Sequence, residues 1–202
     1  DGSAFADDEL LEQMVSLIGA GHETTASALT WALYHIHRDA RVKARLLEEL
    51  SGSDGPGDPE ALTRLPYLDA VCSEALRLNP VAPLVGRTLR QGLTLQGYDL
   101  PAGVSVGIGI VNVHRRPELY PEPEQFRPER FLEREYSAFE YLPFGGGSRR
   151  CLGAAFAVYE MKLVLATVLR TDGLRLVTDA PVRAALRNTT VGPAATIEMA
   201  RG

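Results

Sequence analysis

The stretch Phe144–Gly153, FGGGSRRCLG, contains one thiol among three consecutive glycines and two arginines. A thiolate is favoured near cationic groups and at a helix N-terminus, and Cys151 has Arg149 and Arg150 beside it and a long apolar-periodic segment after it. The glycines can adopt backbone angles closed to other residues, and they leave room for a bulky flat group. Because a thiolate ligand pushes electron density onto haem iron and favours O–O cleavage, this loop indicates a haem site for oxygen activation.

Read as F-x-x-G-x-R-x-C-x-G, the same stretch resembles the haem-binding loop of the cytochrome P-450 monooxygenases. The fixed positions fall at Phe144, Gly147, Arg149, Cys151 and Gly153. The resemblance implies haem b, with Cys151 as the axial ligand of the iron and Arg149 at a haem propionate. The alternative is a glycine-rich turn with an incidental buried cysteine. Three further motifs of the same family disfavour that alternative.

Composition limits the class of protein. The 202 residues are 45% hydrophobic and 23% charged, enough for the core of one large domain or two small ones. The net charge of −5 argues against a nucleic-acid surface, which normally shows a basic excess. Cys72 and Cys151 form neither CxxC nor CxxCH, which disfavours disulfide scaffolds, zinc ribbons and covalently attached haem. No apolar run approaches the ~20 residues of a membrane span, so we expect a soluble, cytoplasmic protein.

Apolar residues recur from Leu10 to Ile36 and predict one long helix from Asp7 to about Asp39, buried because they cover most of its circumference. The sextet from Ala20 to Thr25, AGHETT, interrupts this pattern with a glycine, a carboxylate and two threonines. Threonine hydroxyls can bond to backbone carbonyls, so we expect the helix to be locally opened here.

The sextet resembles the oxygen-binding groove of the same family, whose pattern is [AG]-G-x-[DE]-T-[TS]. The residues that match its fixed positions are Ala20, Gly21, Glu23, Thr24 and Thr25. The resemblance implies that Ala20 and Gly21 border the haem. It also implies that Glu23 and Thr24 form an acid–alcohol pair that delivers protons to bound dioxygen. The alternative is a kinked core helix with a satisfied polar patch.

Pro66 begins another predicted helix, which ends at Asn79-Pro80. Glu74 and Arg77 lie three residues apart on it, and the simplest interpretation is an exposed ion pair away from the apolar face. However, Glu74-Ala75-Leu76-Arg77 also resembles the family's E-x-x-R element. In the family this pair joins the arginine of a PERF element, here Arg130 in residues 128–131, and fixes the cysteine loop from behind.

The prolines in residues 80–87 exclude helix and predict an extended segment. The resemblance implies that Leu84 and Val85 face the substrate and that Arg87 binds a haem propionate. Thr189 matches the family's last substrate-contacting turn, within a strand-like tail from Leu174 to Ile197. Other expected elements are a surface loop over residues 51–59, a tight hairpin over 93–100, a strand over 104–113 and a proline-rich meander over 117–128.

A second core helix is predicted over residues 153–170, with apolar positions at Phe156, Leu163, Val164 and Val168. We expect four basic side chains to form a patch that attracts an acidic electron donor: Arg149, Arg150, Lys162 and Arg170. For Lys162 and Arg170, an ordinary solvated face is the alternative.

The motifs occur in family order over nearly the whole chain. We therefore expect residues 1–202 to form a partial cytochrome P-450 domain of the bacterial soluble type. It would run from the oxygen-groove helix to the C-terminus and be mainly α with small β-sheets. The implied reaction inserts one oxygen atom into an unactivated C–H bond of an apolar small molecule, with a slight preference for a lipid, fatty acid or terpenoid. Electrons would come from NAD(P)H through a ferredoxin and its reductase or a flavin reductase.

Two other classes remain open. The chain could be a truncated, non-catalytic haem-binding product, or a haem-thiolate protein that uses peroxide. Peroxide users of this superfamily commonly alter the threonine groove, so Glu23 with Thr24 favours the oxygen-reducing route. Because the chain opens at the groove helix, we expect the family's N-terminal half to be absent. The isolated chain would then self-associate or require a complementing N-terminal segment.

Overall fold

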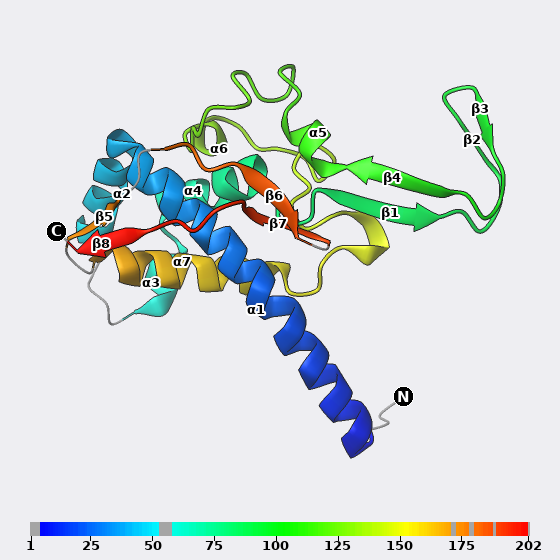
Figure 1. The fold of residues 1–202 in the computed structure, drawn as a ribbon, viewed down its shortest axis with the longest axis horizontal. Helices are drawn as coiled ribbons and strands as arrows, with labels where there is room; N and C mark the ends of the chain where they lie inside the picture. The colour runs from blue at the N-terminus through cyan, green and yellow to red at the C-terminus, as the bar shows by residue number, and fades with distance from the viewer. Residues whose placement is uncertain (1–4, 53–57, 171–172, 178–179, 188, 202) are drawn as a thin grey trace.

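The described part of the chain is a group of packed helices with short two-stranded sheets at its edges (Figure 1). A computed structural model describes residues 5–52, 58–170, 173–177, 180–187 and 189–201. Its helices are α1 (Asp7–Arg38), α2 (Ala40–Gly52), α3 (Pro59–Thr63), α4 (Pro66–Leu78), α5 (Ile110–His114), α6 (Arg130–Glu133) and α7 (Ala154–Arg170). Its strands are β1 (Leu84–Thr88), β2 (Leu93–Leu95), β3 (Tyr98–Leu100), β4 (Ser105–Gly109), β5 (Leu174–Leu176), β6 (Ala184–Arg187), β7 (Thr190–Pro193) and β8 (Met199–Arg201). Antiparallel pairs form between β1 and β4, β2 and β3, β5 and β8, and β6 and β7. The expected fold class is confirmed.

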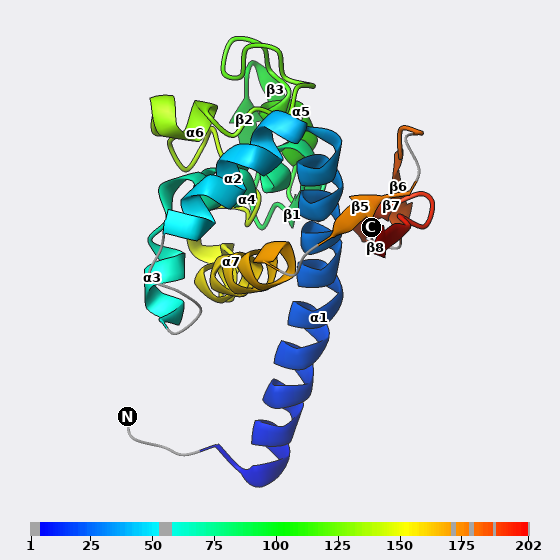
Figure 2. The same ribbon diagram turned by 90° about the vertical axis from the view of Figure 1, so that its left-hand side faces the viewer.

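Helix α1 is the long helix that the apolar pattern predicts, and its two halves differ in environment. Acidic residues in the first turn favour its start, and the Glu9 carboxylate accepts a hydrogen bond from the Ala6 N–H. The second half packs against α4 and α7, and β7 contacts it as well (Figure 2). Trp31, Ala32 and Ile36 there are fully or almost fully buried. This half is the part of α1 that belongs to the core.

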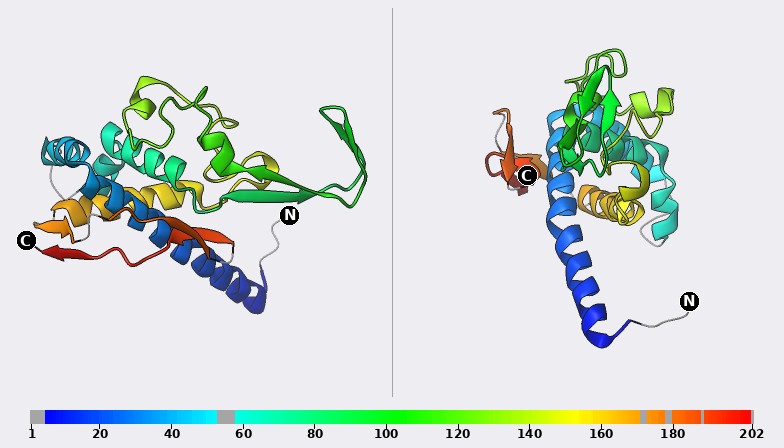
Figure 3. Two further views of the ribbon diagram at one scale, coloured as in Figure 1. Left: turned by 45° about the horizontal axis from the view of Figure 1, so that its top comes forward. Right: turned by 90° about the vertical axis from the view of Figure 1, so that its right-hand side faces the viewer.

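The first half of α1 projects beyond the other elements (Figures 2 and 3). Its large apolar side chains are between 47% and 68% exposed: Leu10, Leu11, Met14, Val15, Leu17 and Ile18. The expectation of a buried helix is therefore wrong for this half of the described structure, because no described element packs against it. The apolar pattern predicts a covered face whose cover is not among the described residues.

Helix α4 is the central element of the core. A residue of α2 caps its N-terminus: the Glu49 carboxylate accepts hydrogen bonds from the Tyr67 and Leu68 N–H groups at 2.8 and 2.9 Å. Pro66 in the first turn fits a helix start. Residues from α1, α2, α4 and α7 form one cluster around it, with the most buried members Ala32, Ile36, Val42, Leu46, Leu68, Val71, Cys72, Leu165 and Ala166.

The predicted hairpin over residues 93–100 is present as β2 and β3. Gln96 and Gly97 form its turn with φ values of 52° and 84°, the sign that a two-residue hairpin turn requires. The hairpin lies at the tip of the long β1–β4 ribbon (Figure 3). The predicted strand over 104–113 is wrong in its second half, where α5 begins at Ile110. A helical turn there lets the Ile110 N–H bond to the Pro83 carbonyl at 2.9 Å and buries both Ile110 and His114.

Two other expectations change and one is confirmed. Phe156 on α7 is 68% exposed, because the buried face of this helix follows Met161, Leu165 and Leu169 instead. The strand-like tail is present as β5, β6 and β7. Within the predicted surface loop over residues 51–59, the first two residues end α2, and 53–57 lie outside the described residues. Among the described helices, none has the length and apolar character needed to cross a membrane.

Candidate functional site

The cysteine loop is held in a curled conformation by its own backbone. Gly145 and Gly147 have φ values of 69° and 67°, which L-residues with side chains rarely adopt. The Gly145 N–H bonds to the Leu142 carbonyl at 2.9 Å, and the Cys151 N–H bonds to the Phe144 carbonyl at 3.0 Å. The thiol therefore sits at the end of a closed turn, three residues before α7 begins at Ala154.

This loop borders open space. A Cβ atom added to Gly145, Gly147 or Gly153 would meet nothing within 4 Å. Cys151 is exposed, and Leu152 beside it is 92% exposed. A thiol, an uncovered glycine backbone and exposed apolar side chains suit a flat, largely apolar group that takes one ligand from the protein. The residues present thus fit a haem.

The two cysteines have opposite environments. Burial raises the pKa of the Cys72 thiol to about 12, so it stays protonated in the core. Cys151 is exposed next to two arginines. Within the described residues, no group of three or more His, Cys, Asp or Glu side chains could hold a metal ion. Cys151 is the candidate metal ligand, because a haem iron can take a single thiolate from the protein.

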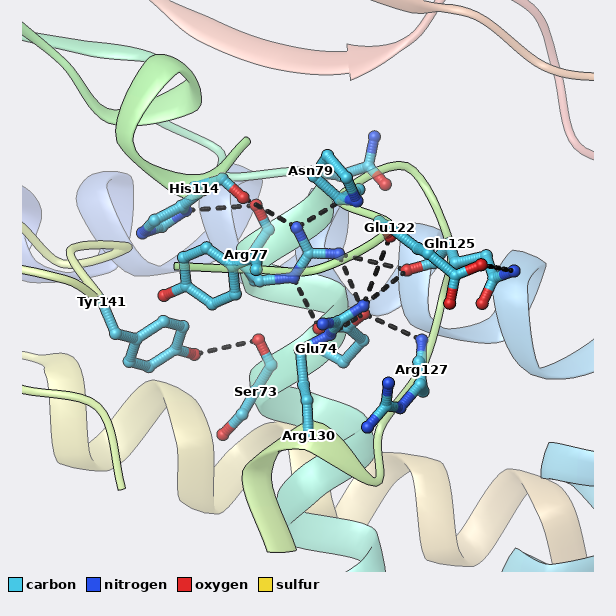
Figure 4. A network of polar contacts seen from close by, with 12 residues as sticks. Ser73, Glu74, Arg77, Asn79, His114, Glu122, Gln125, Arg127, Arg130 and Tyr141 are labelled. Carbon is cyan, nitrogen blue, oxygen red and sulfur yellow. Dashed lines mark hydrogen bonds and ion pairs between the residues drawn. The ribbon is translucent and has the colours of Figure 1, made fainter. Parts of the chain in front are cut away.

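A buried charge network is centred on Glu74 of α4 (Figure 4). Arg77 donates through Nε to Glu74 Oε2 at 2.6 Å and through Nη2 to Oε1 at 2.9 Å. Arg130 donates through Nε to Oε1 at 3.0 Å, and the Arg127 N–H donates to the same oxygen at 2.8 Å. Glu74 and Arg77 are 0% exposed and Arg130 is 2% exposed. The interpretation of Glu74 and Arg77 as an exposed pair is therefore wrong.

The remaining guanidinium N–H groups bond to the carbonyl oxygen of His114 on α5 and to carbonyl oxygens of the meander over residues 117–128. Arg77 Nη1 donates to the carbonyls of His114 and Pro123 at 2.8 and 2.9 Å, and Nη2 donates to that of Gln125 at 3.2 Å. Arg130 Nη1 donates to the Pro121 carbonyl at 3.1 Å. The network thus ties α4 to α6 and to a segment without regular structure.

Comparison with known proteins identifies the family of this chain. A family model, "Cytochrome P450", matches residues 1–184. The chain belongs to the cytochrome P-450 family. It is 42% identical over 193 residues to cytochrome P-450 135B1 of Mycobacterium tuberculosis, covering 96% of this chain and 40% of that protein. It is 38% identical over 195 residues to cytochrome P-450 137 of the same organism, covering 95% of this chain and 38% of that protein.

Relatives outside bacteria match as well. The chain is 38% identical over 173 residues to cytochrome P-450 3A29 of Sus scrofa, covering 83% of this chain and 34% of that protein. The chain thus spans about two fifths or less of the length of these curated relatives. Its helices and small antiparallel sheets form part of the cytochrome P-450 fold.

The predicted oxygen groove of this cytochrome P-450 chain lies in the middle of α1, which contacts α7. The expected opening of the helix is wrong, because α1 is continuous through residues 20–25. The Thr24 hydroxyl donates to the Ala20 carbonyl at 2.6 Å and satisfies it without breaking the helix. Gly21 and Glu23 are exposed on the same helix. Thr24 is half-buried and Thr25 is 5% exposed, so only part of this motif is accessible.

The predicted propionate and substrate residues lie at accessible positions. Arg87 on β1 is exposed, and its guanidinium donates to the neighbouring Gly86 carbonyl at 2.7 Å. Arg149 is exposed in a short 3₁₀ turn. Leu84 is 58% exposed, Val85 is half-buried, and Thr189 is exposed in the turn between β6 and β7.

Two segments that the resemblance assigns to substrate contact are joined in the structure. The Val191 N–H on β7 donates to the Val81 carbonyl at 2.7 Å. This bond brings the turn that contains Thr189 next to the extended segment that leads into β1. The sequence separation between the two segments exceeds one hundred residues, so their proximity depends on the tertiary fold.

The expected basic patch is wrong for two of its four members. Lys162 is 7% exposed, forms an ion pair with Asp69 and donates to the Thr63 carbonyl at 2.8 Å. Arg170 donates to the Leu50 carbonyl at 3.0 Å. Both side chains join α7 to other helices, which also excludes the solvated-face alternative for Lys162. Arg149 and Arg150 remain exposed next to the thiol.

Sequence reasoning missed two residues that the site depends on. Glu129, the second residue of the PERF element, accepts hydrogen bonds from Arg41, Arg45 and the Tyr67 hydroxyl. His114 is 0% exposed and contacts both the network and the segment before the cysteine loop. The available signal for His114 was a histidine directly after an apolar run, which does not distinguish a buried bridge from a surface residue.

Glu74→Gln should strongly destabilise the protein, because it leaves two buried guanidinium groups without their carboxylate. We expect a loss of about 3–5 kcal/mol in the free energy of unfolding, measured by urea denaturation. Glu60→Gln is the matched control, since Glu60 and its partner Arg64 are 77% and 73% exposed and exposed pairs contribute little. An unchanged urea midpoint for Glu74→Gln would show that the network is not needed for stability.

Proposed function

We propose that this chain is the part of a cytochrome P-450 that binds haem b through Cys151 and supports insertion of one oxygen atom into an unactivated C–H bond of an apolar substrate. The observation that carries the proposal is the exposed Cys151 at the end of a glycine turn that borders open space. Haem with a thiolate donor supplies dioxygen activation, because the thiolate favours O–O cleavage.

Each predicted residue has a defined task in this proposal. Cys151 is the axial ligand, supplied from the end of the glycine turn. Arg87 and Arg149 bind the propionates through charge-assisted hydrogen bonds. Their exposed guanidinium groups are available for such bonds.

Thr24 and Glu23 are proposed to manage the proton supply. The Thr24 hydroxyl has one proton, and that proton is donated to the Ala20 carbonyl. The hydroxyl oxygen can still accept a hydrogen bond from a donor, and it can pass its own proton on only by turning away from the Ala20 carbonyl. Glu23 is exposed, so its carboxylate can be reprotonated from water. Ala20 and Gly21 are proposed to border the haem, and a Cβ atom added at Gly21 would meet nothing within 4 Å.

The electron donor and the substrate are also proposals. Electrons from NAD(P)H would arrive through a ferredoxin and its reductase or a flavin reductase, steered by Arg149 and Arg150 beside the thiol. Leu84 and Val85 offer apolar surface for a substrate such as a lipid, fatty acid or terpenoid. Two unpaired cysteines support a reducing, cytoplasmic location.

We propose that the exposed apolar face of α1 is covered by an N-terminal segment of the whole protein or, in its absence, by a second copy of this chain. Six large apolar side chains there are about half or more exposed, a larger patch than soluble monomers usually show. The chain also spans only about 40% of its mycobacterial relatives. Light scattering of the isolated chain should detect association, and a monodisperse monomer would contradict this proposal.

The haem-thiolate proposal is tested by the ferrous carbon monoxide spectrum of the haem-loaded protein. The parent should show the red-shifted Soret band of thiolate ligation, and Cys151→Ala should abolish it. Cys72→Ala is the matched control, because that buried thiol is protonated and should leave the band unchanged. An unshifted band in the parent, as histidine ligation would give, would contradict the assignment.

Thr24→Ala should separate the oxygen-reducing route from a peroxide-dependent one. The variant should retain the thiolate band but form at least about tenfold less product per NADPH consumed, with the difference recovered as hydrogen peroxide, because proton delivery loses its ordered alcohol. Thr30→Ala is the control, since its hydroxyl makes the same bond to a carbonyl four residues earlier on α1. The proposed role of Thr24 would be refuted if Thr24→Ala formed as much product per NADPH as the parent. It would also be refuted if the variant turned over with peroxide alone at the rate of the parent.

A further inference from the structure

His114 lies between the Glu74 network and the segment that leads into the cysteine loop (Figure 4). Its ring is completely buried at the end of α5. Nδ1 lies 3.1 Å from the Arg77 carbonyl oxygen, and Nε2 lies 2.8 Å from the Leu142 amide nitrogen. Both ring nitrogens therefore have a backbone partner, one from each side.

These partners allow only one protonation state. An amide N–H can only donate, so Nε2 must accept from Leu142. A carbonyl oxygen can only accept, so Nδ1 must carry the proton and donate to Arg77. The ring is thus neutral, with the proton on Nδ1. A charged imidazolium would place two donors against each other at Leu142.

The contact with Arg77 is reciprocal. Arg77 Nη1 donates to the His114 carbonyl at 2.8 Å, while the His114 ring donates to the Arg77 carbonyl. Each residue thus holds the backbone of the other. The charged or titratable groups that face the ring are Arg77 from α4, Tyr120 from the meander and Tyr141 from the segment before the loop.

The contact with Leu142 leads directly into the cysteine loop. The Leu142 carbonyl accepts the hydrogen bond from Gly145 N–H that starts the turn, and two residues later the Phe144 carbonyl accepts the one from Cys151. Tyr141 stacks on the His114 ring, with 5.6 Å between centroids and 23° between planes, and its hydroxyl donates to the Ser73 carbonyl at 3.1 Å. The loop therefore starts from a segment that is anchored to α4.

We infer that His114 is a positioning residue that holds the Leu142 amide to α4 and thereby fixes the cysteine loop in the conformation that presents Cys151 as a thiolate ligand. This inference rests on the proposed haem site. Burial lowers the pKa of His114 to about 4, although the bond to the Arg77 backbone opposes the shift. The neutral ring, and with it both hydrogen bonds, is therefore maintained at neutral pH.

Two variants of His114 separate its two hydrogen bonds. The amide of Gln reaches the position of Nε2, so His114→Gln can still accept from Leu142. The shorter amide of Asn reaches only the position of Nδ1, so His114→Asn can donate to Arg77 but releases Leu142. His35→Asn is the matched control. Burial also lowers the pKa of His35 to about 4. His35 bonds to Asn79 at 2.7 Å and stacks on Trp31 and Phe126, which lie outside the cysteine loop.

Two measurements decide the inference. In the ferrous carbon monoxide spectrum, His114→Gln should retain the thiolate band of the parent, and His114→Asn should convert most of it to the unshifted band. Without haem, hydrogen exchange of the Leu142 amide should be about tenfold faster in His114→Asn than in the parent, and close to parental in His114→Gln. His35→Asn should change neither property even where its melting temperature falls.

Three results would overturn the inference. One is a full thiolate band with parental Leu142 exchange in His114→Asn. Another is an equal loss of the band in His114→Gln and His114→Asn. The third is the same loss in His35→Asn, which would mean that the band follows general stability. If the parent itself lacks a thiolate band, the proposed haem site fails, while the Leu142 exchange rates still decide whether His114 holds the loop.

Discussion

A single buried carboxylate between two guanidinium groups is the constraint on which this structure depends. Glu74 contributes one negative charge against the two positive charges of Arg77 and Arg130, and all three side chains are removed from water. Desolvation costs several kcal/mol for each such ion, so the excess positive charge requires other acceptors. Backbone carbonyls supply them, namely those of His114, Pro121, Pro123 and Gln125.

This requirement explains how the meander is ordered without helix or strand. Its carbonyls turn inward toward the guanidinium groups, and the Arg127 N–H turns inward toward Glu74. The same α4 residues then reach the cysteine loop through His114 and Leu142. The apolar core determines how α1, α2, α4 and α7 pack. The charge network determines how the irregular segments attach to that core, and these segments include the one that precedes Cys151.

Much of this could be predicted from local sequence. The helix over 7–38 follows from its apolar period, the hairpin at Gln96-Gly97 from its turn residues, and the thiol loop from glycines next to a cysteine. The burial of Glu74 could not be derived from spacing, because an E-x-x-R pair reads the same on an exposed face. Only the resemblance to a family pointed to its partner Arg130, more than fifty residues further along the chain.

Other errors have the same physical origin, since tertiary contacts override local pattern. Lys162 appeared to be a surface charge, yet Asp69 and the Thr63 carbonyl hold it at a helix interface. The strand predicted to end at Val113 becomes helix because Pro83 offers a carbonyl to Ile110. His114 gave no signal of its bridging position, because both of its partners are backbone groups and leave no pattern of side-chain types.

Hydrogen exchange of Glu74→Gln compared with the parent tests whether Glu74 orders both the meander and the cysteine loop. We predict that peptides covering residues 117–130 and 142–151 exchange at least about tenfold faster, while α2 and the C-terminal turns of α7 keep their relative protection. Faster exchange confined to the Arg127 amide, with an unchanged loop around Cys151, would show that Glu74 does not order the loop.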